Sequence, residues 1–167
     1  MKRTFAQICR DFFLPKPDRR LGVRLLVSAG IALLFFWGLF KPCIIAGESM
    51  APSYRNGITL VFRWRYAFAP PRRGDVVTIS YFGRRELLKR VVGLPGDTVE
   101  FRHGSLLVNG ETADEPYVVY PCSWNKTPVT VRPGHCYVVG DNRSQPDMSE
   151  HIFGEVEMKR ITGGPLF

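Results

Sequence analysis

Histidine is scarce in this sequence of 167 residues, and no histidine lies in a recognisable catalytic motif. His103, His135 and His151 stand at none of the spacings typical of a metal site, and the four cysteines are scattered. The sequence therefore predicts no metal site and implies no cofactor. A Ser-His-Asp triad stays open as an alternative catalytic arrangement.

The sequence also lacks a glycine-rich phosphate-binding loop, internal repeats and low-complexity segments. Its formal net charge of +8 could suggest a nucleic-acid partner. However, residues 1–24 carry seven Lys or Arg against two Asp, and the basic residues downstream are interleaved with acidic ones. Because the positive charge is concentrated at the N-terminus, we expect no nucleic acid among the partners.

A long apolar run follows the basic N-terminal segment. Residues 25–40 contain no charge, and the run reaches twenty residues if Arg24 extends its guanidinium to the membrane interface. Twenty helical residues span roughly 30 Å, the thickness of the hydrocarbon layer of a bilayer. The sequence therefore predicts one transmembrane helix over residues 21–40. A cleaved export signal is disfavoured, because the run exceeds a usual signal core and Ile44-Ile45-Ala46 is a poor cleavage site.

The basic residues before this helix predict its orientation. The positive-inside rule places residues 1–20 in the cytosol. Residues 41–167 then lie on the exported side, periplasmic or extracellular, of the plasma (inner) membrane. We therefore expect a single-pass protein that has the lipid bilayer among its partners.

This topology changes the interpretation of the cysteines. Cys9 falls in the reducing cytosol, whereas Cys43, Cys122 and Cys136 fall where disulfides persist. A bridge between Cys122 and Cys136 is one prediction, and it would contribute about 3 kcal/mol in the chain-entropy model. A buried free thiol at Cys136 is the alternative.

Beyond residue 40 the sequence is typical of a β domain, with short strands separated by turn residues. Asn56-Gly57 and Asn109-Gly110 predict hairpin turns. Residues 76–81 and 86–92 read as two strands joined by a turn, and residues 116–133 as a long connection or a minor hairpin. Strand-like alternation over residues 61–68 places Phe62, Trp64, Tyr66 and Phe68 on one face, either in the core or at the lipid interface.

Ser49 and Lys89 are the candidate reactive residues. A lysine activates a serine only as the uncharged amine, so its pKa must fall well below the usual value of about 10.4. In a strand over residues 86–92, Leu87 and Val91 share the face of Lys89, and such apolar neighbours disfavour the ammonium form. Arg90 points the other way, and its guanidinium cannot be the base.

Three blocks carry a resemblance to a known family: Gly47 to Pro52, Lys89 to Asp97 and Val138 to Arg143. In sequence and in order they resemble the motifs of bacterial type I signal peptidases, and the match covers most of residues 41–160. The resemblance implies a mainly β fold, a signal-peptidase-like β-sheet catalytic domain preceded by one N-terminal transmembrane helix. It also implies a serine endopeptidase with a Ser49/Lys89 dyad and an acyl-enzyme intermediate.

The resemblance implies exported preproteins with signal peptides as substrates. The precursor would lie as an extended strand between residues 43–47 and 86–88, with alanine-sized residues at the first and third positions before the cut. Four residues would shape the shallow apolar pockets for these side chains: Ile45, Met50, Leu87 and Leu88. The backbone N–H of Ser49 would bind the oxyanion. Gly47 stands where some relatives supply a hydroxyl, so the oxyanion hole would rely on backbone donors or on another, unidentified group.

The third block departs from the family pattern. Pro146, Met148 and Glu150 stand where the family usually has a serine, an acid and a base, and Ser144 or Ser149 is a candidate for the lost hydroxyl. The residues expected to support the dyad are Arg90, Gly140, Asp141, Asn142 and Glu150. Because Met148 cannot hold Arg90 as an acid would, we expect Glu150 to pair with it, with Asp147 as the alternative.

Two other functions stay open. One is a dedicated maturation peptidase of the same superfamily that serves a single substrate, such as a conjugative pilin. The other is a catalytically silent membrane-anchored binding module, which the departures in the third block favour.

Overall fold

The computed structural model of the chain describes residues 19–81, 85–144 and 154–166. The chain forms two compact units, Met1–Leu39 and Phe40–Phe167. In the first unit, helix α2 (Arg19–Leu39) has 21 residues, a mean hydropathy of 1.9 and no buried residue. By length and composition it could cross a membrane, so the predicted apolar helix is confirmed as a helix.

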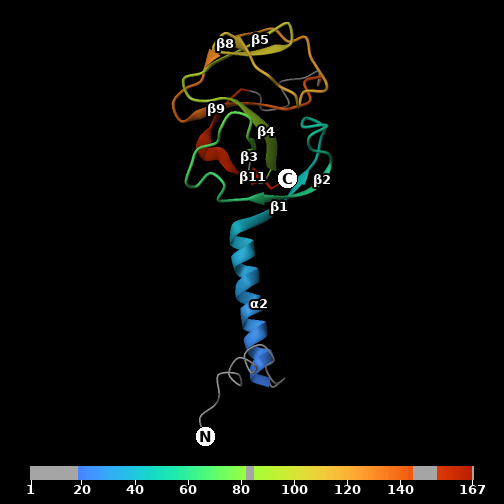
Figure 1. Cartoon of the computed structure of the whole chain (residues 1–167), viewed down its shortest axis with the longest axis vertical. Coiled ribbons are helices and arrows are strands. Elements are labelled where there is room, and N and C mark those ends of the chain that lie inside the picture. The colour runs from blue at the N-terminus through green and yellow to red at the C-terminus, as the bar shows by residue number, and fades with distance from the viewer. Residues whose placement is uncertain (1–18, 82–84, 145–153, 167) are drawn as a thin grey trace, which may run out of the picture. The chain divides into compact units, whose positions relative to one another are not determined.

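The second unit, called the β unit below, consists almost entirely of strands (Figure 1). These are β1 (Phe40–Ile45), β2 (Gly57–Phe62), β3 (Val76–Tyr81), β4 (Arg85–Gly93), β5 (Thr98–Arg102), β6 (Ser105–Val108), β7 (Glu111–Thr112), β8 (Lys126–Thr130), β9 (His135–Val139), β10 (Gly154–Glu157) and β11 (Ile161–Pro165), with the 3-10 turn η1 at Met158–Arg160. The expectation of a mainly β fold behind one apolar helix is confirmed.

The strands form two antiparallel sheets. The larger has the order β1-β2-β11-β3-β4-β9-β10, and the smaller has the order β7-β6-β5-β8. Strand β11, from the C-terminal end of the described chain, inserts between β2 and β3. Figure 1 places β5 and β8 of the smaller sheet at the end of the β unit opposite to β1.

Strand β4 divides the core into two clusters because its successive side chains point to opposite faces. Val91 packs with Val77, Val138 and Val156 inside the larger sheet. Val92 packs in a second cluster against the smaller sheet. Lys89 lies two residues before Val91, so its side chain points to the same face of β4 as Val91.

The segment 61–68 corrects one prediction. Strand β2 ends at Phe62, which pairs with Phe40 at the start of β1, and residues 63–68 form turns instead of a longer strand. Trp64 is 51% exposed and Phe68 is 90% exposed. The interpretation as a core strand is therefore wrong, because no partner strand continues beyond Phe62 to bury these rings.

The predicted Cys122–Cys136 bridge is also wrong, since both thiols are free. Cys136 lies wholly buried in the larger sheet's core, where burial raises its pKa to about 11. Cys122 lies beside the smaller sheet, and its Sγ donates to the carbonyl oxygen of Gly104. The two side chains belong to different parts of the β unit, and the alternative of a buried free thiol is confirmed. Cys9 lies outside the described residues.

One of the two predicted hairpin turns is confirmed. Asn109 and Gly110 have φ values of 56° and 84° between β6 and β7, as a tight hairpin requires. Asn56-Gly57 instead closes a longer connection, residues 46–56, between the paired strands β1 and β2. This connection, called the nucleophile loop below, contains Ser49.

Candidate active site

The nucleophile loop is fixed by its own backbone. Gly47 has a φ of 109°, which favours glycine, and its N–H donates to Asn56 Oδ1 at 2.8 Å. The next turn is closed by Ala51 N–H donating to Glu48 O and Tyr54 N–H donating to Met50 O. Ser49 is therefore held in a tight turn at the end of β1 and remains partly exposed.

Lys89 meets Ser49 from the centre of β4. Its Nζ lies 2.7 Å from Ser49 Oγ, although forty residues separate the two in sequence. The predicted burial of Lys89 is confirmed: the residue is 1% exposed and pairs with Val77 across β3 and β4. Burial lowers the pKa of Lys89 to about 8, against the opposing effect of the nearby Asp141 carboxylate. A neutral amine beside a serine hydroxyl can accept its proton.

The third sequence block holds the backbone of Ser49. Asn142 N–H donates to the carbonyl oxygen of Ser49 at 3.0 Å, and Asn142 Nδ2 donates to that of Glu48 at 3.1 Å. A side chain at Gly140 would collide with the same Ser49 carbonyl, so glycine permits the close approach. Gly140 and Asn142 therefore hold the backbone around Ser49.

Arg90 is held by Asp141. Its Nε and Nη2 donate to the two carboxylate oxygens at 2.7 and 2.6 Å, and its Nη1 donates to Gly74 O. The sequence pointed to Glu150, with Asp147 as the alternative, as the carboxylate that pairs with Arg90, whereas the structure shows Asp141 in this position. In the pairing of β4 with β9, Arg90 lies opposite Val139, and Asp141 follows two residues later on the same face. Glu150, Asp147 and Met148 lie outside the described residues.

Residues 115–120, called the strap below, were missed by sequence reasoning. Arg143 is 1% exposed, and its guanidinium donates to both carboxylate oxygens of Glu115. Its Nε donates to Gly140 O at 2.8 Å, and its N–H donates to Tyr120 O. Glu115 thus holds the arginine that in turn holds the loop behind Ser49. Arg143 could have been noticed, because it lies inside the third block. Its partner Glu115 could not, because it lies in a segment without clear periodicity.

The strap also contacts the residue next to Lys89. The guanidinium carbon of Arg90 lies 3.9 Å from the centre of the Tyr117 ring. Tyr117 Oη donates to Glu115 Oε1 at 2.8 Å. The strap therefore braces both halves of the candidate site, the loop behind Ser49 through Arg143 and strand β4 through Arg90.

The residues expected to line the substrate groove lie near the dyad in sequence and differ in exposure. Ile45 and Leu87 are partly exposed, Leu87 on the same face of β4 as Lys89. Met50 and Leu88 are buried, Leu88 on the opposite face of β4. A salt bridge between Lys41 of β1 and Glu86 of β4 brings the two flanking segments together.

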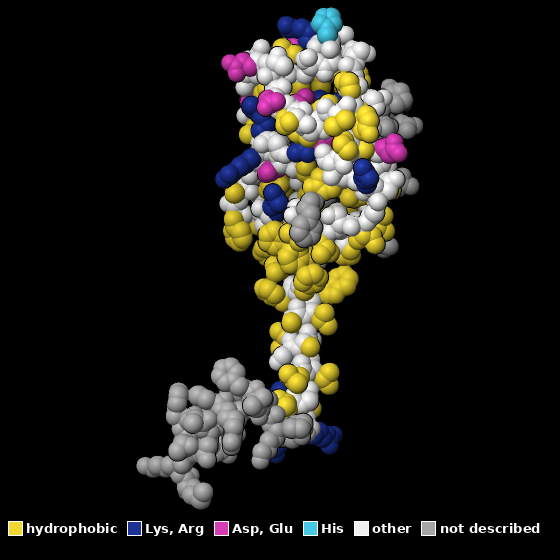
Figure 2. Space-filling view, turned by 45° about the vertical axis from the view of Figure 1, so that its right-hand side comes forward, with side chains coloured by type: hydrophobic (Ala, Val, Ile, Leu, Met, Phe, Trp, Pro, Cys, Tyr) yellow, Lys and Arg dark blue, Asp and Glu magenta, His cyan; other side chains and the backbone are white. Residues whose placement is uncertain are grey.

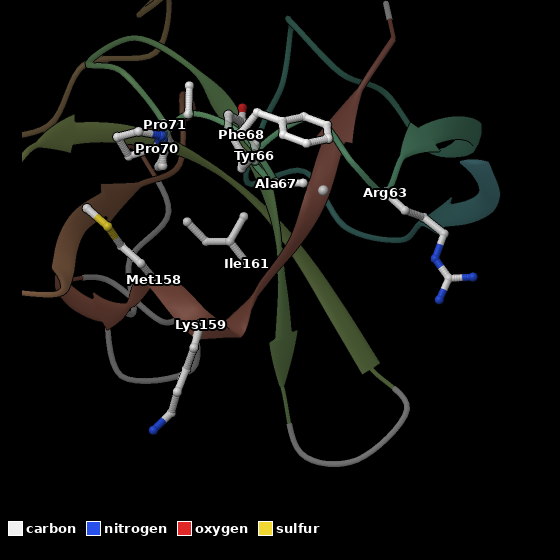
Figure 3. A pocket seen from close by; sticks show the side chains of 11 residues that line it. Arg63, Tyr66, Ala67, Phe68, Pro70, Pro71, Met158, Lys159 and Ile161 are labelled. Atoms are coloured by element: carbon white, nitrogen blue, oxygen red, sulfur yellow. The ribbon is translucent and has the colours of Figure 1, made fainter. Parts of the chain in front are cut away.

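Two of the cavities lined by described residues lie on the β unit. The first, of about 570 Å³, has mainly apolar walls that include Tyr66, Phe68, Met158 and Ile161, while Arg63 and Lys159 project from its edges (Figure 3). The second, of about 560 Å³, borders the nucleophile loop and is polar. Its walls include Glu48, Arg55 and Asn142.

A serine hydroxyl within hydrogen-bond distance of a buried lysine amine is equipped for acyl transfer, the chemistry of serine peptidases. Comparison with known proteins agrees with this class. Residues 19–166 match the family described as "Signal peptidase, peptidase S26". The chain therefore belongs to this family, that of the bacterial type I signal peptidases, and it is an enzyme of that kind.

Individual relatives agree with the family. A probable signal peptidase I-1 from Synechocystis is 33% identical over 86% of this chain and 78% of that protein. A signal peptidase I from Bacillus licheniformis is 32% identical over 86% of this chain and 83% of that protein. Among solved structures, a signal peptidase I from Enterococcus faecalis is 30% identical, covers 56% of this chain and 95% of its own, and has a TM-score of 0.45.

Proposed function

We propose that the protein removes N-terminal signal peptides from exported preproteins with Ser49 as nucleophile and Lys89 as general base. The observation that carries this proposal is the 2.7 Å separation of Ser49 Oγ and Lys89 Nζ, together with the burial that lowers the lysine pKa to about 8. A substantial fraction of Lys89 is then neutral near physiological pH, as a base must be.

Each proton in the proposed mechanism passes through Lys89. The neutral amine accepts the Ser49 proton as Oγ attacks the scissile carbonyl carbon. The oxyanion receives a hydrogen bond from the Ser49 backbone N–H. Lys89 then protonates the leaving amine, which departs as the new N-terminus of the released protein and leaves an acyl-enzyme. Finally, Lys89 accepts a proton from water as the water oxygen attacks the ester carbonyl carbon. It returns this proton to Ser49 Oγ as the ester bond breaks and the carboxylate of the signal peptide is released.

We infer a small-x-small preference before the cut. The proposed substrate strand lies between the end of β1 and the start of β4, two strands that a salt bridge between Lys41, near the start of β1, and Glu86 connects. Partly exposed Ile45 and Leu87 offer apolar contacts there, and the buried Met50 leaves little depth. Shallow apolar sites of this kind favour alanine-sized side chains.

We infer further that α2 crosses the plasma (inner) membrane with residues 1–20 in the cytosol and the β unit on the exported side. The charges that support this orientation are the basic residues before the helix. Ile44 and Ile58, which pair across β1 and β2, are exposed, and so are Trp64 and Phe68 in the turns that follow β2. These four residues are called the apolar end below. Figure 2 shows hydrophobic side chains gathered at one end of the β unit. We propose that the apolar end contacts the bilayer.

The proposal is tested by incubating the detergent-solubilised protein with several precursors and sequencing the new N-termini. We expect cleavage after small-x-small motifs and covalent labelling of Ser49 by an acylating inhibitor. Ser49→Ala should lose cleavage by at least about a hundredfold, because the hydroxyl is required for the covalent step. Turnover of Ser49→Ala within tenfold of wild type would rule out this nucleophile.

The same experiment separates the alternatives. Cleavage of one precursor alone would favour a dedicated maturation peptidase. The absence of both labelling and cleavage would favour a silent binding module.

A further inference from the structure

The polar cavity beside the nucleophile loop has no role in the mechanism described above. Its volume is about 560 Å³, within the range of ligand sites. Its walls come from three elements of the candidate site: the nucleophile loop, the third block and the strap. Residues that represent the walls are Glu48, Ala51, Arg55, Tyr120, Asn142 and Ser144.

The cavity lies next to Ser49, on the path that the substrate is expected to follow. Its walls include Glu48 and Ala51, which flank Ser49 on either side in the chain. By contrast, Ile45 and Leu87, proposed to contact the residues before the cut, are not among its walls. A peptide whose scissile carbonyl reaches Ser49 must continue beyond the nucleophile on the side away from those residues.

We propose that this cavity binds the first residues after the cut, the N-terminus of the released protein. The inference rests on Ser49 being the nucleophile and adds a second specificity site to the same reaction. The occupant is a short extended peptide with polar side chains. The cavity of Figure 3, by comparison, is lined mainly by rings and aliphatic side chains, with Arg63 and Lys159 only at its edges, and suits such a segment less well.

The charged walls of the cavity indicate which peptide side chains it would prefer. Glu48 and Arg55 are exposed walls of opposite sign. Within the described parts of the chain, neither side chain has a salt-bridge partner. Arg55 is therefore available to an acidic side chain of the peptide, and Glu48 to a basic one or to the newly formed α-amine.

The walls are ordered before substrate arrives. Asn142 donates to Glu48 O, and its own Oδ1 accepts from both the N–H and the Oγ of Ser144. On the other side, Gly47 N–H donates to Asn56 Oδ1. The same hydrogen bonds fix the loop that carries Ser49. A peptide bound in the cavity would therefore be positioned relative to Ser49 with little loss of conformational entropy in the protein.

The test uses precursors that differ at the first two positions after the cut, where they carry Asp, Asn or Lys. The ratio of kcat/KM for the Asp and Lys precursors is measured for the full-length wild type, Arg55→Gln and Arg55→Glu. Lys126→Glu is the matched control, because it makes the same charge change at an exposed residue of β8 in the smaller sheet.

We expect Arg55→Glu to shift the ratio about two- to fivefold toward the Lys precursor, as exposed charge pairs do, with Arg55→Gln between it and wild type. High salt should reduce the shift. An unchanged ratio in Arg55→Glu, or an equal shift in Lys126→Glu, would overturn the subsite while leaving the peptidase reaction intact. Failure of the wild type to cleave any precursor would overturn the proposed function itself.

Discussion

At the scale of the residue, the base of the candidate dyad is produced by burial. Lys89 is surrounded by the β3–β4 core, and removal from water is the main cause of its lowered pKa. The nearby Asp141 carboxylate acts in the opposite direction, but Arg90 engages that carboxylate in two hydrogen bonds. The Arg90–Asp141 pair therefore helps to keep a negative charge from stabilising the ammonium form.

This environment predicts the pH dependence of the reaction. In the proposed mechanism the neutral amine is the active form, so kcat/KM should rise with pH through about 8 and level off above it. Below that pKa, each unit of pH should lower the rate about tenfold. Lys89→Arg should be inactive throughout, since a guanidinium keeps its proton. The measurement is kcat/KM for a precursor peptide between pH 5 and pH 10.

Lys126→Arg is the control for this profile, because it makes the same substitution at an exposed position far from the dyad in the fold. It should leave the profile unchanged. A flat profile for the wild type, or activity in Lys89→Arg, would require a different base.

Ser49 and Lys89 could be found in the sequence because each lies in a compact local motif. The partner of Arg90 could not be found in this way, because it depends on the register between β4 and β9. That register places Arg90 opposite Val139 and so brings Asp141 to the guanidinium. The expectation that Glu150 would pair with Arg90 followed sequence separation within the third block, which says nothing about strand pairing.

At the scale of the element, the strap is the segment whose importance was hardest to recognise in the sequence. Glu115→Gln should destabilise the β unit by about 3 kcal/mol, because it leaves the buried Arg143 guanidinium without its carboxylate. It should also slow acylation of Ser49, since Arg143 holds Gly140 behind the nucleophile. The measurements are urea unfolding and the rate of labelling by an acylating inhibitor.

Glu155→Gln is the matched control for the strap. Glu155 pairs with Arg132, whose side chain is 67% exposed, so its loss should cost no more than about 1 kcal/mol and leave acylation unchanged. Equal effects of the two substitutions would mean that the strap does not support the site.

Elements with local signals were predicted best. The strands over residues 76–81 and 86–92, the second of which extends over Arg85–Gly93 in the structure, and the Asn109-Gly110 turn were predicted from alternation and turn chemistry. Residues 63–68 were misread as strand because an alternating aromatic pattern does not reveal whether a partner strand is present. The strap shares this difficulty, since its glutamate and tyrosine are defined by contacts with Arg143 and Arg90.

At the scale of the whole molecule, the apolar end predicts where the β unit meets lipid. Full-length variants that retain one of the three tryptophans can be reconstituted in bilayers that carry brominated acyl chains. Fluorescence of Trp64 should be quenched, because exposed aromatic residues favour the membrane interface. The measurement is the loss of emission relative to the same variant in non-brominated lipid.

Trp124 provides the control within the same β unit. It packs edge-on against Phe101 of the smaller sheet, away from the apolar end, and should keep its emission in brominated lipid. Equal quenching of both tryptophans would contradict contact through the apolar end, and so would the absence of quenching in both.

The insertion of β11 has a consequence for the order of events during synthesis. In the larger sheet, the β1–β2 pair that carries Ser49 joins the β3–β4 pair that carries Lys89 through β11. A chain made from its N-terminus therefore completes both reactive segments well before the strand that unites them. A nascent chain halted before residue 161 would lack the strand that joins the two hairpins within this sheet. We expect the enzyme to remain harmless to neighbouring precursors until its own final strand is in place.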